Sequence, residues 1–279
     1  MRKMIFLCLA LLLCLPLASY AASIGGVETQ GQGKFAIGLD QEFVFDRDGK
    51  TFTKTEIDGT LTIVWPVKTE VDKMYRTMVK AGYGLLDNLD VYVRLGMANP
   101  DYKQKVDGTW TNSAGVSPYD KGTFTGSAKY KGDSAFAYGF GMKGTHPLEN
   151  DWLVGCDVQY LRHKNNYKAT ASLTVYDDNG VVIDEGTGDW KGKITLYEWH
   201  VAPYVARKLG NFVPYFGIRY SDARVKDEDE DGETTKIKAK DNFGVFLGTD
   251  YKLNEVWSLN LEGRFADETA ISFGGTYRF

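Results

Sequence analysis

The sequence predicts an all-β fold, an antiparallel up-and-down transmembrane β-barrel of about ten strands with short turns at one end and long loops at the other. Its 279 residues include 17 Tyr, 15 Phe and 31 Gly, and aromatic side chains favour a pleated surface. After the first 20 residues, no apolar run approaches the roughly 18 to 20 residues of a membrane-spanning helix. Ten later segments alternate between apolar and polar residues with the period of two that marks a strand.

The first 21 residues differ from the rest and predict an export signal. Arg2 and Lys3 precede an apolar core at 4–17, and Ser19-Tyr20-Ala21 places small residues at the two positions that a signal peptidase reads. The core, about 14 residues long, is too short for a retained anchor. We therefore expect cleavage after Ala21.

Cleavage leaves a mature chain of 258 residues with a formal net charge of −6, because the signal carries two basic residues and no acidic ones. An acidic chain disfavours a nucleic-acid partner. Cys156 is the one cysteine that remains, so we expect no internal disulfide.

The strands follow in order along the mature chain. The first, 34–45, places Phe35 and Ile37 on one face and Asp40 and Glu42 on the other. The same alternation recurs at 75–83, 89–97, 136–142, 152–160, 197–205, 212–220, 243–251, 257–265 and 271–279.

A soluble β-sandwich shows the same alternation, so the connections decide between sandwich and barrel. Short connections at 87–88, 145–151, 207–211 and 252–255 alternate with long polar ones at 46–72, 99–133, 163–193 and 221–240. The connection at 266–268 is short although it lies on the long-loop side. Short turns on one rim and long loops on the other are typical of a membrane barrel.

Two segments of the long loops are ambiguous. The run 61–67 could add a strand pair, but Pro66 and the charges around it favour a hairpin within the loop. Residues 173–176 and 181–184 also predict a hairpin projecting beyond the membrane.

Aromatic residues at strand ends support the membrane assignment. They lie next to the short turns, where they would form an interfacial girdle. They are Trp152, Phe212, Tyr251, Trp257 and Phe279.

The inward faces of the ten strands carry seven acids and seven bases, which we expect to form a charge network that fills a narrow lumen. With His200 added to these fourteen residues, the candidate network comprises Asp40, Glu42, Arg76, Lys80, Asp90, Arg94, Lys143, Asp157, Glu198, His200, Arg219, Asp250, Glu262, Arg264 and Arg278. The alternative is that some of these residues stand in water at the barrel mouths.

Two motifs resemble ligand sites but lack what the chemistry needs. The glycines of 139–144 match a dinucleotide fingerprint, yet His146-Pro147 follows where a helix must begin. The acidic run 227–233 opens like a calcium loop, yet its twelfth position is Lys238 where a bidentate Glu is required, which leaves at most a weak cation contact. We expect no cofactor and no resident metal.

The C-terminus carries a family resemblance. Ile271, Phe273, Tyr277 and Phe279 alternate up to a terminal Phe, which resembles the assembly signal of Gram-negative outer-membrane β-barrel proteins. With the export signal and the hairpin at 83–96, the whole mature chain resembles the small opacity-type, outer-membrane-protein-like barrels, although Gly275 departs from the bulky residue usual in the terminal pattern.

The resemblance implies an outer-membrane location, contact with outer-membrane lipid, and assembly by the barrel-insertion machinery. It divides the chain into a signal peptide at 1–21, a periplasmic N-terminal segment at 22–32 and the barrel domain at 33–279. The family's roles range from narrow pore to adhesion or structural support, so it implies no particular extracellular partner.

Three functions follow as hypotheses. The first is a non-enzymatic barrel with a structural or surface-contact role and a largely charge-plugged lumen, with no catalytic residues. The second is a narrow passive porin. The third is an outer-membrane hydrolase, because Glu198 and His200 share one inward face and omptin-type proteases are ten-stranded barrels with carboxylate and histidine groups near the outer rim.

Overall fold

The computed structural model describes residues 23–118, 120–229 and 234–279. Apart from one short 3-10 helix, η1 (Glu149–Asp151), the regular structure in these residues is antiparallel β-strand. The strands are β1 (Phe35–Asp48), β2 (Phe52–Asp58), β3 (Leu61–Leu86), β4 (Leu89–Asn112), β5 (Lys121–Gly132), β6 (Ala135–Pro147), β7 (Trp152–Asp177), β8 (Val182–Arg207), β9 (Phe212–Asp229), β10 (Thr234–Lys238), β11 (Phe243–Lys252), β12 (Trp257–Phe265) and β13 (Thr269–Arg278).

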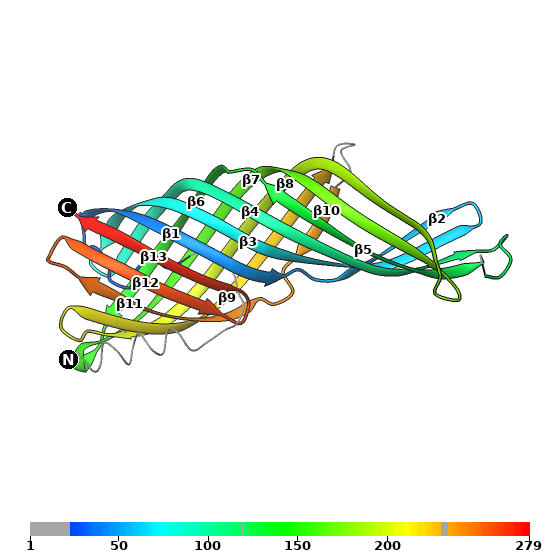
Figure 1. Ribbon diagram of the computed structural model, residues 1–279. Helices are drawn as coiled ribbons and strands as arrows, with labels where there is room; N and C mark the ends of the chain where they lie inside the picture. The colour runs from blue at the N-terminus through cyan, green and yellow to red at the C-terminus, as the bar shows by residue number, and fades with distance from the viewer. Residues whose placement is uncertain (1–22, 119, 230–233) are drawn as a thin grey trace.

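The sheet closes into a ring with ten strand positions in its wall, each of which we call a stave (Figure 1). β1 pairs with both β13 and β3, and the pairing of β3 with β4 completes the circle. β5 and β6 follow one another in a single stave between β4 and β7, and β10 and β11 do the same beside β9. Each of the ten predicted strand segments lies in a different stave, so the predicted transmembrane β-barrel is confirmed.

The long connections differ from the expectation, because most of their residues are strand rather than loop. β3, β4, β7 and β8 continue far past the barrel wall and, with β2 and β5, form the sheet extension at the right of Figure 1. The two hairpins expected within the loops are present: β2 pairs with β3 at 61–67, and β7 turns into β8 at 178–181.

The sequence pattern concealed these strands for a physical reason. On β5, Lys129 and Lys131 point outward, whereas Ala128 and Tyr130 point inward and are buried. Above the lipid the outward side chains are polar, so the apolar outward alternation that revealed the lower strands is absent while backbone pairing continues.

The outside of the barrel is an apolar belt bounded by two rings of aromatic side chains. On β1 the belt runs from Phe35 to Phe45, which are 57% and 52% exposed. Ten rises of about 3.4 Å at a tilt of about 40° span about 26 Å, the height of the apolar band of a transmembrane barrel. The lower ring includes Phe35, Tyr83, Trp152, Phe212, Trp257 and Phe279, and the upper ring includes Phe45, Tyr75, Phe136, Trp199, Tyr220 and Phe243.

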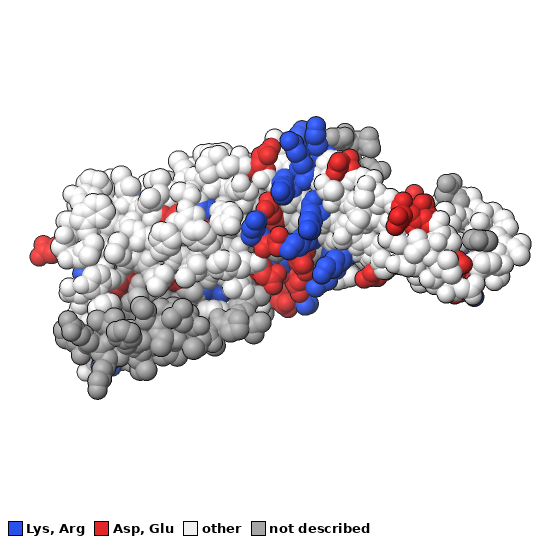
Figure 2. Space-filling view, viewed as in Figure 1, with Lys and Arg blue, Asp and Glu red and all other residues white. Residues whose placement is uncertain are grey.

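Charged side chains begin where the belt ends. Figure 2 shows Lys, Arg, Asp and Glu gathered in a band between the barrel wall and the extension. Among the described residues, no helix is long and apolar enough to cross a membrane.

The belt makes a testable prediction at Leu247, which points outward from β11 midway between Phe243 of the upper ring and Tyr251 at the lower end of the strand. Leu247→Arg places a charge near the lipid midplane and should lower the free energy of unfolding in lipid by about 2 to 4 kcal/mol. The matched control is Leu253→Arg, in the turn between β11 and β12, which should cost far less. Equal unfolding free energies for the two variants, measured by denaturant titration in lipid vesicles, would contradict the position of the belt.

Candidate functional site

The lumen is the candidate site, and its wall holds most of the residues predicted to face inward. Lys80 is half-buried, and Arg278 lies apart near the lower mouth, where its Nη1 donates to Ser258 Oγ at 3.0 Å. The other members are buried: Asp40, Glu42, Arg76, Asp90, Arg94, Lys143, Asp157, Glu198, His200, Arg219, Asp250, Glu262 and Arg264.

Glu42 of β1 is the centre of the network. Its carboxylate lies 2.9 Å from Arg94 of β4, 3.5 Å from Arg76 of β3 and 3.7 Å from Arg264 of β12. Glu42 and Arg264 are completely buried, and the other two arginines are 1% exposed. One carboxylate thus joins four staves of the barrel across its interior.

The network continues upward from this centre and includes Arg47, which the sequence did not reveal. Arg76 also contacts Glu198 at 3.3 Å, and Arg47 lies 3.7 Å from the same carboxylate. The strand alternation did not identify Arg47, because a register shift between Val44 and Asp46 changes which residues of β1 face inward.

A second branch continues from Arg47 through Ser221, whose hydroxyl accepts from Arg47 Nη2 at 3.4 Å and donates to Asp267 at 2.8 Å. Arg219 contacts Asp267 at 2.9 Å and Glu268 at 2.8 Å, and Arg264 Nε donates to Glu268 at 3.0 Å. Asp267 and Glu268 lie in the short turn between β12 and β13, where no strand alternation exists to assign them to the lumen.

The proposed hydrolase pair does not form in this arrangement. His200 Nε2 lies 3.1 Å from Asp157, which also accepts the Tyr92 hydroxyl at 2.8 Å. Glu198 instead faces the arginines. Both candidate groups are buried inside the charge network, away from solvent.

The segment before β1, expected to lie below the barrel, enters the lumen. Ser23 N–H donates to Glu42 at 2.9 Å, and Val27 N–H donates to Asp250 at 2.8 Å. Lys143 donates to the carbonyl of Ile24 at 2.6 Å. The backbone of this segment therefore supplies partners to lumen charges.

Apolar packing also holds the segment. Ile24 and Val27 are 2% and 0% exposed and pack in a cluster with Leu153, Tyr204 and Phe246 of the inner wall. At the lower mouth the chain leaves the lumen, with Gln32 N–H donating to Asp87 at 3.1 Å. We call residues 23–32 the N-terminal plug.

Glu28 anchors the plug to the rim. Its carboxylate lies 2.7 Å from Lys252 and 3.2 Å from Lys208, in or beside the two neighbouring turns. Burial acts to raise the pKa of Glu28, but the two ammonium groups outweigh it and hold this pKa below its ordinary value.

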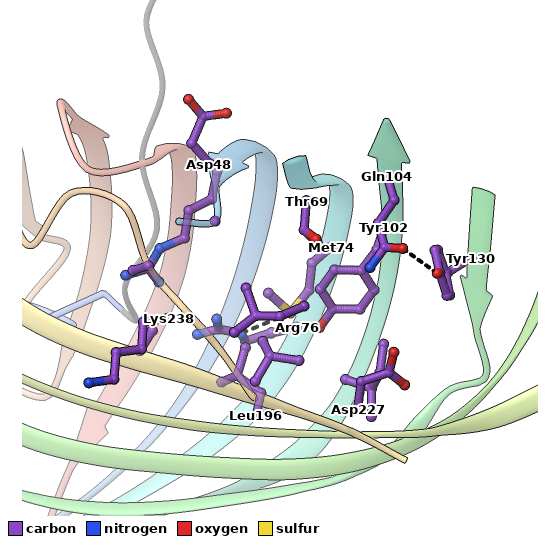
Figure 3. A pocket seen from close by; sticks show the side chains of 17 residues that line it. Asp48, Thr69, Met74, Arg76, Tyr102, Gln104, Tyr130, Leu196, Asp227 and Lys238 are labelled. Atoms are coloured by element: carbon purple, nitrogen blue, oxygen red, sulfur yellow. Dashed lines mark hydrogen bonds between the residues drawn. The ribbon is translucent and has the colours of Figure 1, made fainter. Parts of the chain in front are cut away.

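A small chamber lies above the charge network (Figure 3). Its volume is about 50 Å³, and its walls include Arg76, Met74, Tyr102 and Leu196. The Tyr130 hydroxyl donates to Gln104 across its rim at 2.5 Å. A space of this size holds a few water molecules and is much smaller than a cavity that admits benzene.

The described residues contain no group of three or more His, Cys, Asp or Glu side chains placed to hold a metal. The centre of the acidic run considered for a weak cation contact, 230–233, falls outside the described residues. The glycines of 139–144 lie within β6, and η1, a single 3-10 turn at Glu149–Asp151, follows them in place of an α-helix. The C-terminal alternation lies on the outer surface of β13, with Ile271 and Phe273 facing outward.

Comparison with known proteins identifies no family for this chain. No family model matches it, and no curated protein matches it. Among solved structures, it is similar to the outer membrane protease OmpT from Escherichia coli, with 11% identity, a TM-score of 0.46, and coverage of 87% of this chain and 94% of that one. It is also similar to an outer membrane channel from Pseudomonas putida F1, with 7% identity, a TM-score of 0.39, and coverage of 93% and 100%.

A third similar structure is the outer membrane protein OprG from Pseudomonas aeruginosa, with 11% identity, a TM-score of 0.29, and coverage of 91% and 99%. The three differ in their named roles, and likenesses this distant carry no argument about function.

The network predicts the effect of removing its central carboxylate. Glu42→Ala leaves Arg76, Arg94 and Arg264 without their shared partner and should destabilise the barrel by about 3 to 5 kcal/mol. Glu56→Ala, an exposed position on β2, should cost less than about 0.5 kcal/mol. Unfolding in detergent, followed by tryptophan fluorescence, compares the two variants, and a similar small cost for both would show that the network does not support the fold.

Proposed function

We propose that this protein is a closed, non-enzymatic outer-membrane barrel that supports a surface-exposed sheet. The filled lumen is the observation that carries the proposal. Paired charges and the N-terminal plug together occupy the space that a conducting channel would need. A pore that selects ions by sign requires an excess of one charge along an open wall.

The location is part of the proposal. An apolar belt of about 26 Å with aromatic rings matches a membrane crossed by strands, and the alternation at Ile271, Phe273, Tyr277 and Phe279 resembles the assembly signal of outer-membrane barrels. Export requires the signal at 1–21 to be removed. Cleavage after Ala21 leaves a single residue ahead of Ser23, the first residue of the plug.

Burial of its acid and base groups argues against hydrolysis. Glu198 and His200 are 2% and 1% exposed, and each is already engaged by a charged partner. A general base must reach the proton it abstracts, directly or through one water. A substrate entering from outside would first have to displace the charge network.

The proposed location is tested by cell fractionation. The protein should be recovered with outer membranes and should migrate differently on gels when unboiled, because a barrel without free edges resists unfolding by detergent. Recovery as a soluble periplasmic monomer would contradict the proposal.

Conductance measurements distinguish the closed barrel from a narrow pore. The narrow pore is the second candidate function, because the plug is held in the lumen without a covalent bond to the lumen wall. The wild-type barrel should show no stable channels in planar bilayers. Removing residues 23–32, or replacing Arg94, whose guanidinium also donates to the Ser23 carbonyl at 3.2 Å, should produce measurable channels or lower the unfolding temperature. The control Lys121→Ala, at an exposed surface pair with Asp178, should do neither, and porin-like conductance of the wild type would favour the pore.

A further inference from the structure

Lysines gather on the outward face of the sheet extension, on four neighbouring strands. We call them the lysine row, and they are Lys103 of β4, Lys129 and Lys131 of β5, Lys168 of β7 and Lys191 of β8. The extension begins at the charged band that Figure 2 shows next to the apolar wall.

The sheet register places these lysines directly opposite one another. Lys103 is paired with Lys129, Lys131 with Lys168, and Lys168 with Lys191. Like charges directly opposite on antiparallel strands destabilise a sheet. The arrangement is therefore unfavourable unless an anion lies over it.

Neighbouring carboxylates do not neutralise the row. Asp72 contacts Lys103, while Asp101, opposite Lys131, lies 3.7 Å from Lys73. Glu70, opposite Lys103, lies 3.5 Å from Lys68, and the exposed Asp133 and Asp189 each lie two residues from a lysine of the row. In the part of the chain that the structure describes, Lys129, Lys131, Lys168 and Lys191 make no ion pair.

The height of the row above the belt identifies the kind of anion. In the register with β4, Lys131 lies four residues above Phe136, the last exposed aromatic of its stave, which is about 10 Å at a strand tilt of about 40°. Lys168 lies eight residues above Tyr160 and Lys191 eight above Trp199, or about 20 Å. The headgroup layer of an ordinary bilayer adds only about 5 to 8 Å to each side of its hydrocarbon core.

The row thus rises across four strands through a zone beyond ordinary phospholipid phosphates. Its close neighbours are hydroxyl side chains, with Thr170 opposite Lys129, and with Ser127 and Ser172 at 3.3 Å from each other. Ammonium groups bind phosphate, and hydroxyls hydrogen-bond to sugars. An elongated ligand that bears both phosphate and sugar hydroxyls matches this surface.

We propose that the lysine row binds the phosphorylated oligosaccharide headgroup of a glycolipid in the outer leaflet, a proposal that rests on the outer-membrane location proposed above. The phosphates lie over the register pairs of lysines, and the sugars contact the Ser and Thr side chains beside them. Bound ligand removes the repulsion between the opposed lysines and fixes the extension against the leaflet.

The test measures binding of purified lipopolysaccharide to the refolded mature protein in phospholipid nanodiscs by isothermal titration calorimetry. The triple variant Lys129→Gln, Lys131→Gln, Lys168→Gln should bind at least about tenfold more weakly. A matched variant with the same change in charge, Lys121→Gln, Lys236→Gln, Lys240→Gln, should stay within about twofold of the wild type. Because the triple variant loses only repulsive register pairs, its unfolding temperature should not fall.

Further arms identify the source of the anion. Dephosphorylated lipopolysaccharide should bind weakly. Neither inorganic phosphate nor phosphatidylglycerol vesicles should compete with lipopolysaccharide for binding at an equal concentration of phosphate. Equal losses in both variants would overturn the proposal, as would undiminished binding of the dephosphorylated form or full competition by phosphatidylglycerol. Binding of polyglutamate with no binding of lipopolysaccharide would overturn it in favour of an acidic protein partner.

The two proposals fail in distinguishable ways. Outer-membrane fractionation of the wild type refers only to the proposed function, whereas the difference between the two triple variants refers only to the lysine row. A barrel that fractionates correctly and shows no such difference retains its proposed function and loses the glycolipid site.

Discussion

The interior of this barrel depends on one constraint, that an ion taken out of water must have partners in place. Glu42 meets it with arginines from three other staves and with the N–H of Ser23. Removing a partner from such a buried group typically costs several kcal/mol. The carboxylate therefore fixes the relative positions of β1, β3, β4 and β12 more firmly than the backbone ladder alone, which specifies neighbours but not what lies across the lumen.

The same constraint explains why a chain segment lies inside the lumen. Lys143 and Asp250 face the lower part of the lumen, and neither makes a direct ion pair in the described residues, although Asp90 and Asp157 lie opposite Lys143 in the sheet register. Backbone carbonyl and N–H groups of the N-terminal plug supply the partners instead. Ile24 and Val27 meanwhile cover the apolar part of the inner wall, so a single segment satisfies both kinds of surface.

These two features also mark how far the sequence could predict the structure. Strands inside the belt were predictable because lipid on one side and charge on the other produce strict alternation, as at Phe35 to Phe45. The inward position of Arg47 was not predictable, because a β-bulge in β1 changes which of its residues face the lumen. The positions of Asp267 and Glu268 were not predictable either, because these residues lie in a turn. The plug was unpredictable because it binds through its backbone, and backbone groups leave no signature in a sequence.

The contacts of the plug bear on whether the closed state can open by itself. Withdrawal of residues 23–27 would leave Lys143 and Asp250 without their backbone partners and would expose the apolar cluster around Val27. If stranding these ions costs about 6 kcal/mol in total, the open population is about one in ten thousand, since each 1.4 kcal/mol is a tenfold change. Making the open state predominant requires a ligand whose preference for that state exceeds this ratio. In the described residues the plug is held from within the lumen, so an opening ligand would have to act from the lower mouth, where Glu28 and its two lysines hold the plug at the rim.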